Sequence, residues 1–226
     1  MTLTARKIQD ARSRYKKSLK PASLNMLKSG SQNKKLGNKV SVKKWKGMPM
    51  FSLTLEERAT CPTSCDQWDV CYGNNMPFAH RFDHTDPNFK PMLTHQLSGL
   101  ALKYPKGFVV RLHVLGDFYD AKYVTFWKKM LMQFPSLNAF GYTHHPVQSR
   151  IGKSVNKLNT LYKERWRIRF SDDTSGATNY IALVTDEHGA RTSNHVTCPE
   201  QLGKTPSCAD CGICWASEEP VIFIEH

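Results

Sequence analysis

Seven cysteines in two groups constrain this 226-residue chain more than any other feature of its sequence. Cys61, Cys65 and Cys71 form a C-x3-C-x5-C group, and a C-x9-C-x2-C-x2-C group runs from Cys198 to Cys214. The N-terminal residues lack the apolar stretch of a signal peptide, so we expect a cytoplasmic protein with reduced cysteines. Grouped cysteines in a reducing compartment indicate metal or redox chemistry rather than disulfides.

The first group has an open coordination pattern. Three thiolates, from Cys61, Cys65 and Cys71, hold three irons of a [4Fe–4S] cluster and leave the fourth iron for an outside ligand. The same difference separates catalytic metal sites, which keep a free position, from structural ones. Three buried free thiols are the alternative, because cysteine is common in protein cores.

The second group is closed. Its four thiolates, from Cys198, Cys208, Cys211 and Cys214, complete either a four-cysteine cluster or a tetrahedral zinc site. The compact C-x2-C-x2-C run is similar to that of bacterial ferredoxins, which favours an iron–sulfur cluster over zinc. We therefore expect one or two [4Fe–4S] clusters. A mixed arrangement, in which Cys198 joins the first group, stays open.

The net charge of +13 comes from the first 50 residues, which hold 14 Lys and Arg and one acidic residue, Asp10. The other 176 residues hold 18 basic and 18 acidic side chains. Basic segments contact nucleic-acid phosphates, so we expect a basic N-terminal arm over 1–47 that binds DNA or RNA. A solubilising tail, or one that wraps its own core, is the alternative. The candidate contacts are Lys34, Lys35, Lys43, Lys44, Lys46 and Trp45, with Trp45 stacked on a base.

Hydrophobic periodicity predicts a basic helix over 4–19, an extended arm over 22–47 and an α/β core over 48–190. Alternating strands and helices with short connections imply right-handed crossovers. We therefore expect a partial (β/α) barrel or an open, mostly parallel sheet, followed by a cysteine-rich metal segment over 191–226. No apolar run is long enough to span a membrane. The core strands are expected at 48–55, 108–115, 137–143, 166–171 and 180–185, and its helices at 92–104, 120–134 and 153–162.

Several polar residues near the predicted strand ends are candidates for the site. Alternation in the strand over 108–115 places His113 on the face of Arg111, and His144 follows the next strand. Asp172 and Asp173 suit general acid–base chemistry or an Asx turn. The sequence has no G-x-x-x-x-G-K-[ST], G-x-G-x-x-G or G-x-S-x-G motif, which argues against P-loop NTPases, Rossmann dehydrogenases and serine hydrolases.

The order of these motifs resembles the radical S-adenosylmethionine (SAM) superfamily, with a strand, a three-cysteine loop, and later strands ending in Gly116-Asp117-Phe118 and Tyr142-Thr143-His144. The resemblance implies that the three-cysteine loop binds a [4Fe–4S] cluster whose open iron binds SAM. It also implies that Gly116 and Asp117 support SAM, that Ser171 and Asp172 lie near its ribose, and that the last four cysteines hold an auxiliary cluster. The loop departs from the usual C-x3-C-x2-C spacing.

A second resemblance covers most of residues 35–215. In this region the chain is similar to the gene product 88 family of bacteriophages, which has no settled activity. This resemblance implies a phage origin, and hence the host cytoplasm. It rests on Lys35-Leu-Gly-Asn-Lys39, Cys61-Pro62, Cys71-Tyr72, Gly116-Asp117-Phe118, Tyr142-Thr143, Arg169-Phe-Ser-Asp172 and the late Cys-Pro with Cys-x2-Cys-x2-Cys.

Together these patterns predict an iron–sulfur protein, a radical-SAM-like enzyme that acts on nucleic acid or a nucleoprotein. The alternative is a non-catalytic nucleic-acid-binding protein in which a cluster or zinc stabilises a small core.

Overall fold

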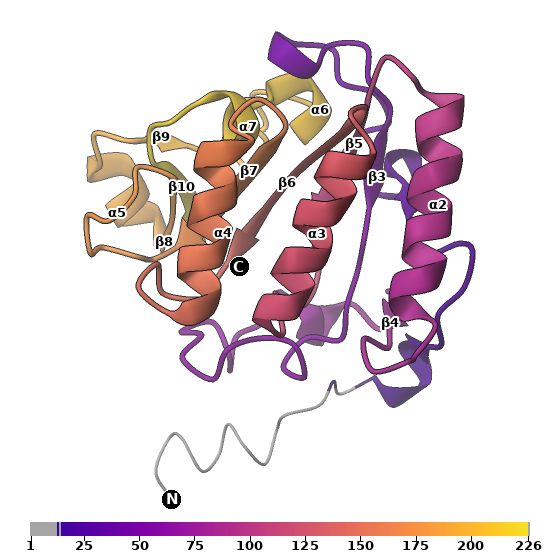
Figure 1. Ribbon diagram of the computed structural model, residues 1–226. Coiled ribbons are helices and arrows are strands. Elements are labelled where there is room, and N and C mark those ends of the chain that lie inside the picture. The colour runs from indigo at the N-terminus through magenta and orange to yellow at the C-terminus, as the bar shows by residue number, and fades with distance from the viewer. Residues whose placement is uncertain (1–12, 14, 226) are drawn as a thin grey trace, which may run out of the picture.

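The structure, a computed structural model, describes Ser13 and residues 15–225. Its main feature is an open eight-stranded sheet in the order β2-β3-β5-β6-β7-β8-β10-β9 (Figure 1). β2 pairs antiparallel with β3, and the other neighbouring strands all pair in parallel. The prediction of an open, mostly parallel sheet is confirmed. The strands are β2 (Lys28–Ser29), β3 (Met50–Ser52), β5 (Phe108–Leu112), β6 (Leu137–Thr143), β7 (Trp166–Ser171), β8 (Ile181–Thr185), β9 (Val196–Thr197) and β10 (Val221–Ile224).

Three helices cover one face of this sheet: α2 (Phe89–Lys103), α3 (Ala121–Gln133) and α4 (Arg150–Leu161). They lie side by side in front of the sheet in Figure 1. Because the order of β3, β5, β6 and β7 follows the chain, right-handed crossovers place their helices on the same face. All three helices, and the strands from β3 to β8, match predicted segments to within a few residues.

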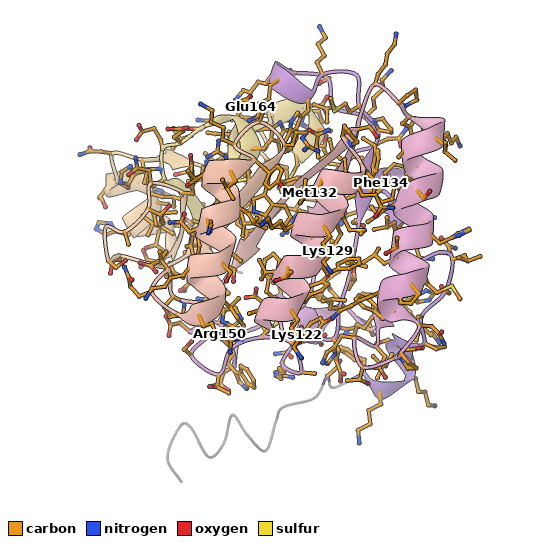
Figure 2. All side chains as sticks on the ribbon, in the orientation of Figure 1. Lys122, Lys129, Met132, Phe134, Arg150 and Glu164 are labelled. Atoms are coloured by element: carbon orange, nitrogen blue, oxygen red, sulfur yellow. The ribbon has the colours of Figure 1, made fainter. Side chains whose placement is uncertain are left out.

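Helix α3 illustrates why these segments form helices. The Asp120 side chain caps its N-terminus by accepting a hydrogen bond from the amide of Tyr123. Tyr123 and Trp127 face the sheet and are buried, whereas Lys122 and Lys129 lie on the solvent side (Figure 2). This amphipathic pattern is the signal from which the helix is predicted.

The two faces of the sheet carry different cores because successive strand residues alternate. In β6, Leu137 and Ala139 pack towards the helices, whereas Phe140 and Tyr142 point to the opposite face. We call this opposite face the inner face. It is covered by the N-terminal segment and by two short C-terminal helices, α6 (Cys208–Cys211) and α7 (Ile213–Ala216).

The segment over 22–47 packs against both faces of the sheet: Met26 and Leu27 join the core under the helices, and the residues from Leu36 to Trp45 cover the inner face. Leu36, Val40 and Trp45 are at most 3% exposed, and Trp45 stacks on Trp215 with a centroid distance of 5.4 Å. The expectation of an extended arm over 22–47 is therefore wrong. These apolar residues stand singly among lysines without a helical or strand period, so periodicity did not reveal their burial.

The predicted basic helix over 4–19 lies mostly outside the described residues. In the described part, Lys16–Ser18 is a 3-10 helix (η1) and Leu19–Lys20 is a strand, β1, parallel to β4 (Arg81–Phe82). The helix therefore does not extend to Leu19.

The C-terminal residues join the main sheet. β8 leads to helix α5 (Glu187–Thr192) and to β9, and β10 then inserts between β8 and β9. Among the residues that the structure describes, no helix has the length and apolar character that a membrane span needs.

A buried ion pair fixes the loop that follows β3. Arg81 and Glu57 are at most 1% exposed, and Arg81 Nε lies 2.6 Å from Glu57 Oε2. The same guanidinium donates to the carbonyls of Gly73, Met76 and Ala79, which holds the short 3-10 helix η4 (Tyr72–Asn75) in place. The pair thus connects β4 to the segment immediately after Cys71.

Replacing Arg81 with Met should leave the Glu57 carboxylate buried without its partner. We expect the free energy of unfolding to fall by about 3–5 kcal/mol, measured by urea denaturation. Arg191→Met is the matched control, because it breaks the exposed Arg191–Glu187 pair, and it should cost within about 0.5 kcal/mol. Equal effects of the two variants would contradict a central role for Arg81.

His113 faces the helices rather than sharing the face of Arg111, so the alternation argument is wrong here. β5 ends at Leu112, and His113 has a φ of 53°, which turns its side chain towards α3. It is 3% exposed, with Nε2 3.1 Å from Tyr123 Oη. Burial, with a smaller contribution from the charge of Arg111, lowers the pKa of His113 to about 3.

This lowered pKa makes stability depend on pH. Below about pH 6.5 the unfolded chain protonates His113 while the folded chain does not, so folding stability falls as the pH drops towards 3. The loss should approach about 1.4 kcal/mol per pH unit. His113→Asn, which tolerates the positive φ, should remove that part of the slope in urea titrations at several pH values. An unchanged slope would show that His113 titrates normally.

Candidate functional site

The four C-terminal cysteines come together at one small cavity beneath the inner face. Its lining includes all four thiols with Glu200 and Trp215. Among the described residues, no group of three or more His, Cys, Asp or Glu side chains converges as the ligands of a single metal ion do. The water-accessible space is about 10 Å³, so the cysteine side chains must move apart when a metal centre enters. The four are Cys198, Cys208, Cys211 and Cys214.

Neighbouring backbone bonds place these cysteines. The amides of Cys208 and Ala209 donate to the carbonyls of Lys35 and Leu36, which joins α6 to the N-terminal segment. Gly212, with a φ of 66°, separates α6 from α7 and turns the chain between the last two cysteines. A residue with a Cβ is strained in this left-handed conformation.

Arg169 on β7 holds the C-terminal segment on the sheet. It is fully buried, and its guanidinium donates to the carbonyls of Cys214 at 3.0 Å and Ser217 at 2.7 Å, and also to those of Ile181, Ile213 and Glu219. Among the described residues no acidic side chain forms an ion pair with Arg169. A buried positive charge without an acidic partner favours negative charge nearby, which thiolates bound to a metal would supply.

Three thiols of this group, those of Cys198, Cys208 and Cys214, have raised pKa values. Burial raises the pKa of Cys208 to about 12 and also raises the pKa values of Cys198 and Cys214. Nearby positive charges oppose these rises: Lys35 acts on Cys198 and Cys208, and Arg169 acts on Cys214. A metal that binds here would displace the thiol protons, so its affinity would depend on pH.

The three-cysteine loop lies at the carboxyl end of β3. Cys61 and Cys71 are partly exposed and Cys65 is buried. Burial raises the pKa of the Cys61 thiol, and the charges of Asp117, Cys65 and Cys71 raise it further, so the three thiols lie within electrostatic range. The loop lies at the edge of the sheet where parallel α/β proteins bind ligands.

Gly116 and Asp117 form a turn against this loop. A Cβ on Gly116 would lie 2.5 Å from Thr60 Oγ1, and its φ is 83°, so this position requires glycine. The Asp117 amide donates to Thr60 Oγ1. Its buried carboxylate accepts hydrogen bonds from the amides of Phe118 and His144, which ties the end of β5 to that of β6. The predicted turn therefore adjoins Cys61, with the Asp117 carboxylate already bonded to backbone.

Ser171 and Asp172 lie at the carboxyl end of β7, along the same edge. The Asp172 carboxylate accepts a hydrogen bond from the amide of Val184. Burial raises its pKa, and both His144 and Asp66 of the three-cysteine loop act on it. Asp173 accepts from the amide of Ser175, which agrees with the Asx-turn alternative for that residue. The edge therefore assembles residues from β5, β6, β7 and the loop.

Two residues that sequence reasoning did not assign to the site, Tyr142 and Arg111, lie near the cysteines. Tyr142 donates a hydrogen bond from its hydroxyl to Cys214 Sγ at 2.9 Å, and the Arg111 guanidinium lies 4.4 Å from its ring centroid. The charge of Arg111 acts on Cys208 and on Tyr72, the residue that follows Cys71. Arg111 is therefore within electrostatic range of both segments. Alternation in β5 and β6 was the available signal for both residues.

The candidate nucleic-acid residues are divided between two places: Lys35 lies beside the C-terminal cysteines, whereas Lys44 and Trp45 lie against Glu164. Trp45 is 2% exposed and donates from Nε1 to the carbonyl of Glu164, so the expectation that it stacks on a base is wrong. Lys35 pairs with Glu200, and Lys44 lies 3.8 Å from Glu164. The remaining lysines of the set are exposed: Lys34, Lys43 and Lys46.

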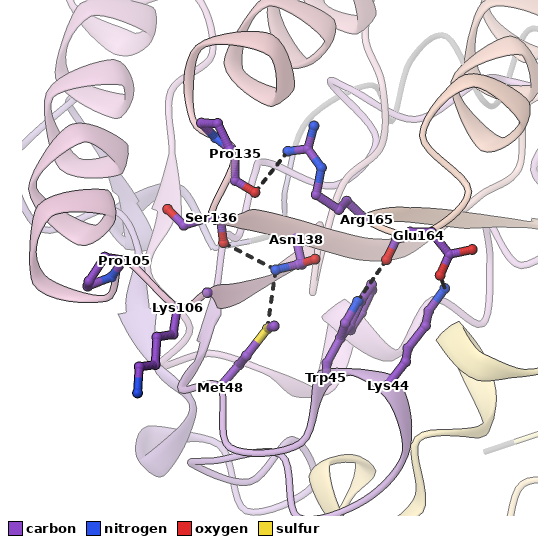
Figure 3. A pocket seen from close by; sticks show the side chains of 11 residues that line it. Lys44, Trp45, Met48, Pro105, Lys106, Pro135, Ser136, Asn138, Glu164 and Arg165 are labelled. Carbon is purple, nitrogen blue, oxygen red and sulfur yellow. Dashed lines mark hydrogen bonds and ion pairs between the residues drawn. The ribbon is translucent and has the colours of Figure 1, made fainter.

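A cavity of about 350 Å³ lies beside these lysines, and Figure 3 shows its lining. Lys44, Lys106 and Arg165 contribute positive charge, and Glu164 contributes the opposite charge. The cavity lies before the first residues of β5, β6 and β7, at the opposite ends of these strands from the three-cysteine loop. It is larger than the cysteine cavity, but among the described residues its lining contains no cysteine or histidine.

Comparison with known proteins identifies the family and nothing further. No match was found among curated proteins, and none was found among solved structures. The model of one family, described as gene product 88, matches residues 24–217, which include all seven cysteines, Arg111, Tyr142 and Arg169. This chain therefore belongs to the gene product 88 family.

Proposed function

We propose that this chain is an iron–sulfur protein with two clusters, one on each cysteine group, and that it acts as a radical-SAM-like enzyme. The observation that carries the proposal is the convergence of the four C-terminal cysteines on one cavity, beside Tyr142 and within the electrostatic range of Arg111. Each part of the proposal rests on a different set of contacts.

The four-cysteine cavity suits a cluster better than a single zinc ion. Four thiols line it, but they do not converge on one point, and a four-iron cluster holds its ligand sulfurs further apart than one ion does. A cluster bound by four thiolates is anionic, and the charges of Arg169, Arg111 and Lys35 act on these cysteines. Zinc in the same cavity is the alternative.

The three-cysteine loop suits a cluster with one open iron. Such a cluster, when reduced, supplies the electron that cleaves SAM. The residues of this chain would hold the bound molecule: the Gly116–Asp117 turn adjoins the loop, and Ser171 and Asp172 lie along the same edge. The surrounding strands would position the substrate and exclude water.

The surface lysines support a nucleic-acid partner. Lys43 and Lys46 are exposed and flank Lys44 and Trp45, which line the larger cavity. They lie at the opposite ends of the strands from the three-cysteine loop, so we propose that they anchor nucleic acid rather than present the reacting group. The second candidate is a non-catalytic nucleic-acid-binding protein with structural clusters or zinc. The basic surface supports this candidate as much as it supports the enzyme.

Metal analysis of anaerobically purified protein tests the two cysteine groups. We expect a brown protein with the broad visible absorbance of [4Fe–4S] clusters. Cys65→Ala should lose one cluster's share of iron and sulfide and the effect of SAM on the EPR signal of the reduced protein. Cys211→Ala should lose a similar share but keep the response to SAM, so each variant is the control for the other.

Three outcomes would contradict parts of this proposal. A colourless protein that contains only zinc would exclude both clusters. Iron content unchanged by Cys65→Ala would contradict the division into three and four cysteines. A brown protein whose EPR signal ignores SAM would remove the enzyme and leave the second candidate.

Charge reversal tests the basic surface. Deleting residues 1–46 would remove buried Leu36, Val40 and Trp45, so point changes are the better test. Lys43→Glu with Lys46→Glu should weaken binding to DNA and RNA oligonucleotides and lower the salt dependence by about one per lysine, measured by fluorescence anisotropy.

The matched control is Lys122→Glu with Lys129→Glu, which makes the same charge change on the outer side of α3 (Figure 2). Binding should be unaffected by that pair. Equal losses from both double variants would show that only net charge matters, and no loss from either would remove the nucleic-acid partner from this surface.

A further inference from the structure

We propose that Tyr142 sets the reduction potential of the C-terminal metal centre by donating a hydrogen bond to the sulfur of Cys214. This inference rests on the proposed cluster at the four cysteines. The Tyr142 hydroxyl lies 2.9 Å from Cys214 Sγ.

The direction of this bond follows from the chemistry of the two groups. A cysteine that ligates a metal is a thiolate, which has no proton and accepts hydrogen bonds. The Tyr142 hydroxyl has one proton to give, so in the loaded protein it must be the donor. Hydrogen bonds to ionised groups are shorter and stronger than those between neutral groups, so metal loading strengthens this contact.

The Tyr142 ring is fixed on the inner face. Phe223 of β10 packs edge-on against it at a centroid distance of 5.4 Å, and the Arg111 guanidinium lies 4.4 Å from its centroid. Tyr142 belongs to β6, a central strand paired on both sides. The hydroxyl therefore has little freedom to leave the sulfur.

The sulfur is fixed from the other side. Arg169 on β7 donates from Nε to the Cys214 carbonyl at 3.0 Å. Both the donor and the anchor of Cys214 thus come from neighbouring strands, in register through the Tyr142–Arg169 pair. Such a rigid outer shell keeps a ligand's hydrogen bond the same in both redox states.

The hydrogen bond from Tyr142 affects how readily the cluster accepts an electron. A hydrogen bond to a ligand sulfur withdraws electron density from the thiolate, which stabilises the reduced, more negative cluster and raises its potential. Tyr142→Phe keeps the ring and its contacts but removes the hydroxyl. Tyr142 is therefore a positioning and tuning residue, and it does not touch the reacting atoms at the three-cysteine loop.

The test is a redox titration of the full chain followed by EPR, in a Cys65→Ala background so that the remaining signal comes from the C-terminal cluster. Tyr142→Phe should retain iron and sulfide but shift the midpoint potential to a more negative value. Substituting 3-fluorotyrosine at position 142, a more acidic donor, should shift it in the positive direction. Tyr180→Phe is the matched control, because its hydroxyl bonds Glu218 instead of a cysteine, and it should cause no shift.

The possible outcomes distinguish a failure of this inference from a failure of the proposed cluster. If the parent protein gives no cluster signal, the proposed cluster itself is wrong. If the parent titrates normally and both Tyr142 variants keep the parent midpoint with full iron content, the cluster stands and the tuning role of Tyr142 is refuted. Opposite shifts from the two variants would support it.

Discussion

The buried guanidinium of Arg169 is the interaction on which the candidate site most depends. It satisfies its charge with backbone carbonyls of the C-terminal segment instead of a carboxylate, and so it fixes α7 on the inner face. Removing it would leave several buried carbonyls without donors and would release Cys214 from Tyr142. Arg81 has the same role at the other cysteine group, where its bonds hold the chain after Cys71. Each group is therefore held in place by one arginine.

Much of the fold was predictable because the α/β core has strong periodicity. α3 shows a capping aspartate and an amphipathic face, and β7 was predicted with its observed bounds. The inner layer was not predictable in the same way. Trp45 and Trp215 are far apart in the sequence and meet only because two irregular segments cover the same face. At His113 the backbone adopts a left-handed conformation, so the side chain does not lie on the face that strand alternation predicts. Hydrophobic periodicity does not reveal such a local turn.

The candidate site was predictable in its residue types but not in its connections. The cysteine spacing indicated two groups, and the four C-terminal cysteines line one cavity in the structure. Arg111 lies in a strand with an ordinary core pattern, and Tyr142 and Arg169 were recognised only as parts of sequence motifs. The importance of all three comes from the groups that they contact across the sheet. The lysines show the opposite case. Their charge was evident, but the burial of Trp45 depends on tertiary packing alone.

The ends of the sheet have a consequence for how copies of this protein behave in solution. An open sheet has two edges, and an exposed edge offers unpaired backbone groups to another chain. Here both edge strands, β2 and β9, are only two residues long, and β2 runs antiparallel to its neighbour. Each edge thus presents few donors and acceptors in an extended row. The sheet can therefore remain open at both ends without inviting edge-to-edge aggregation.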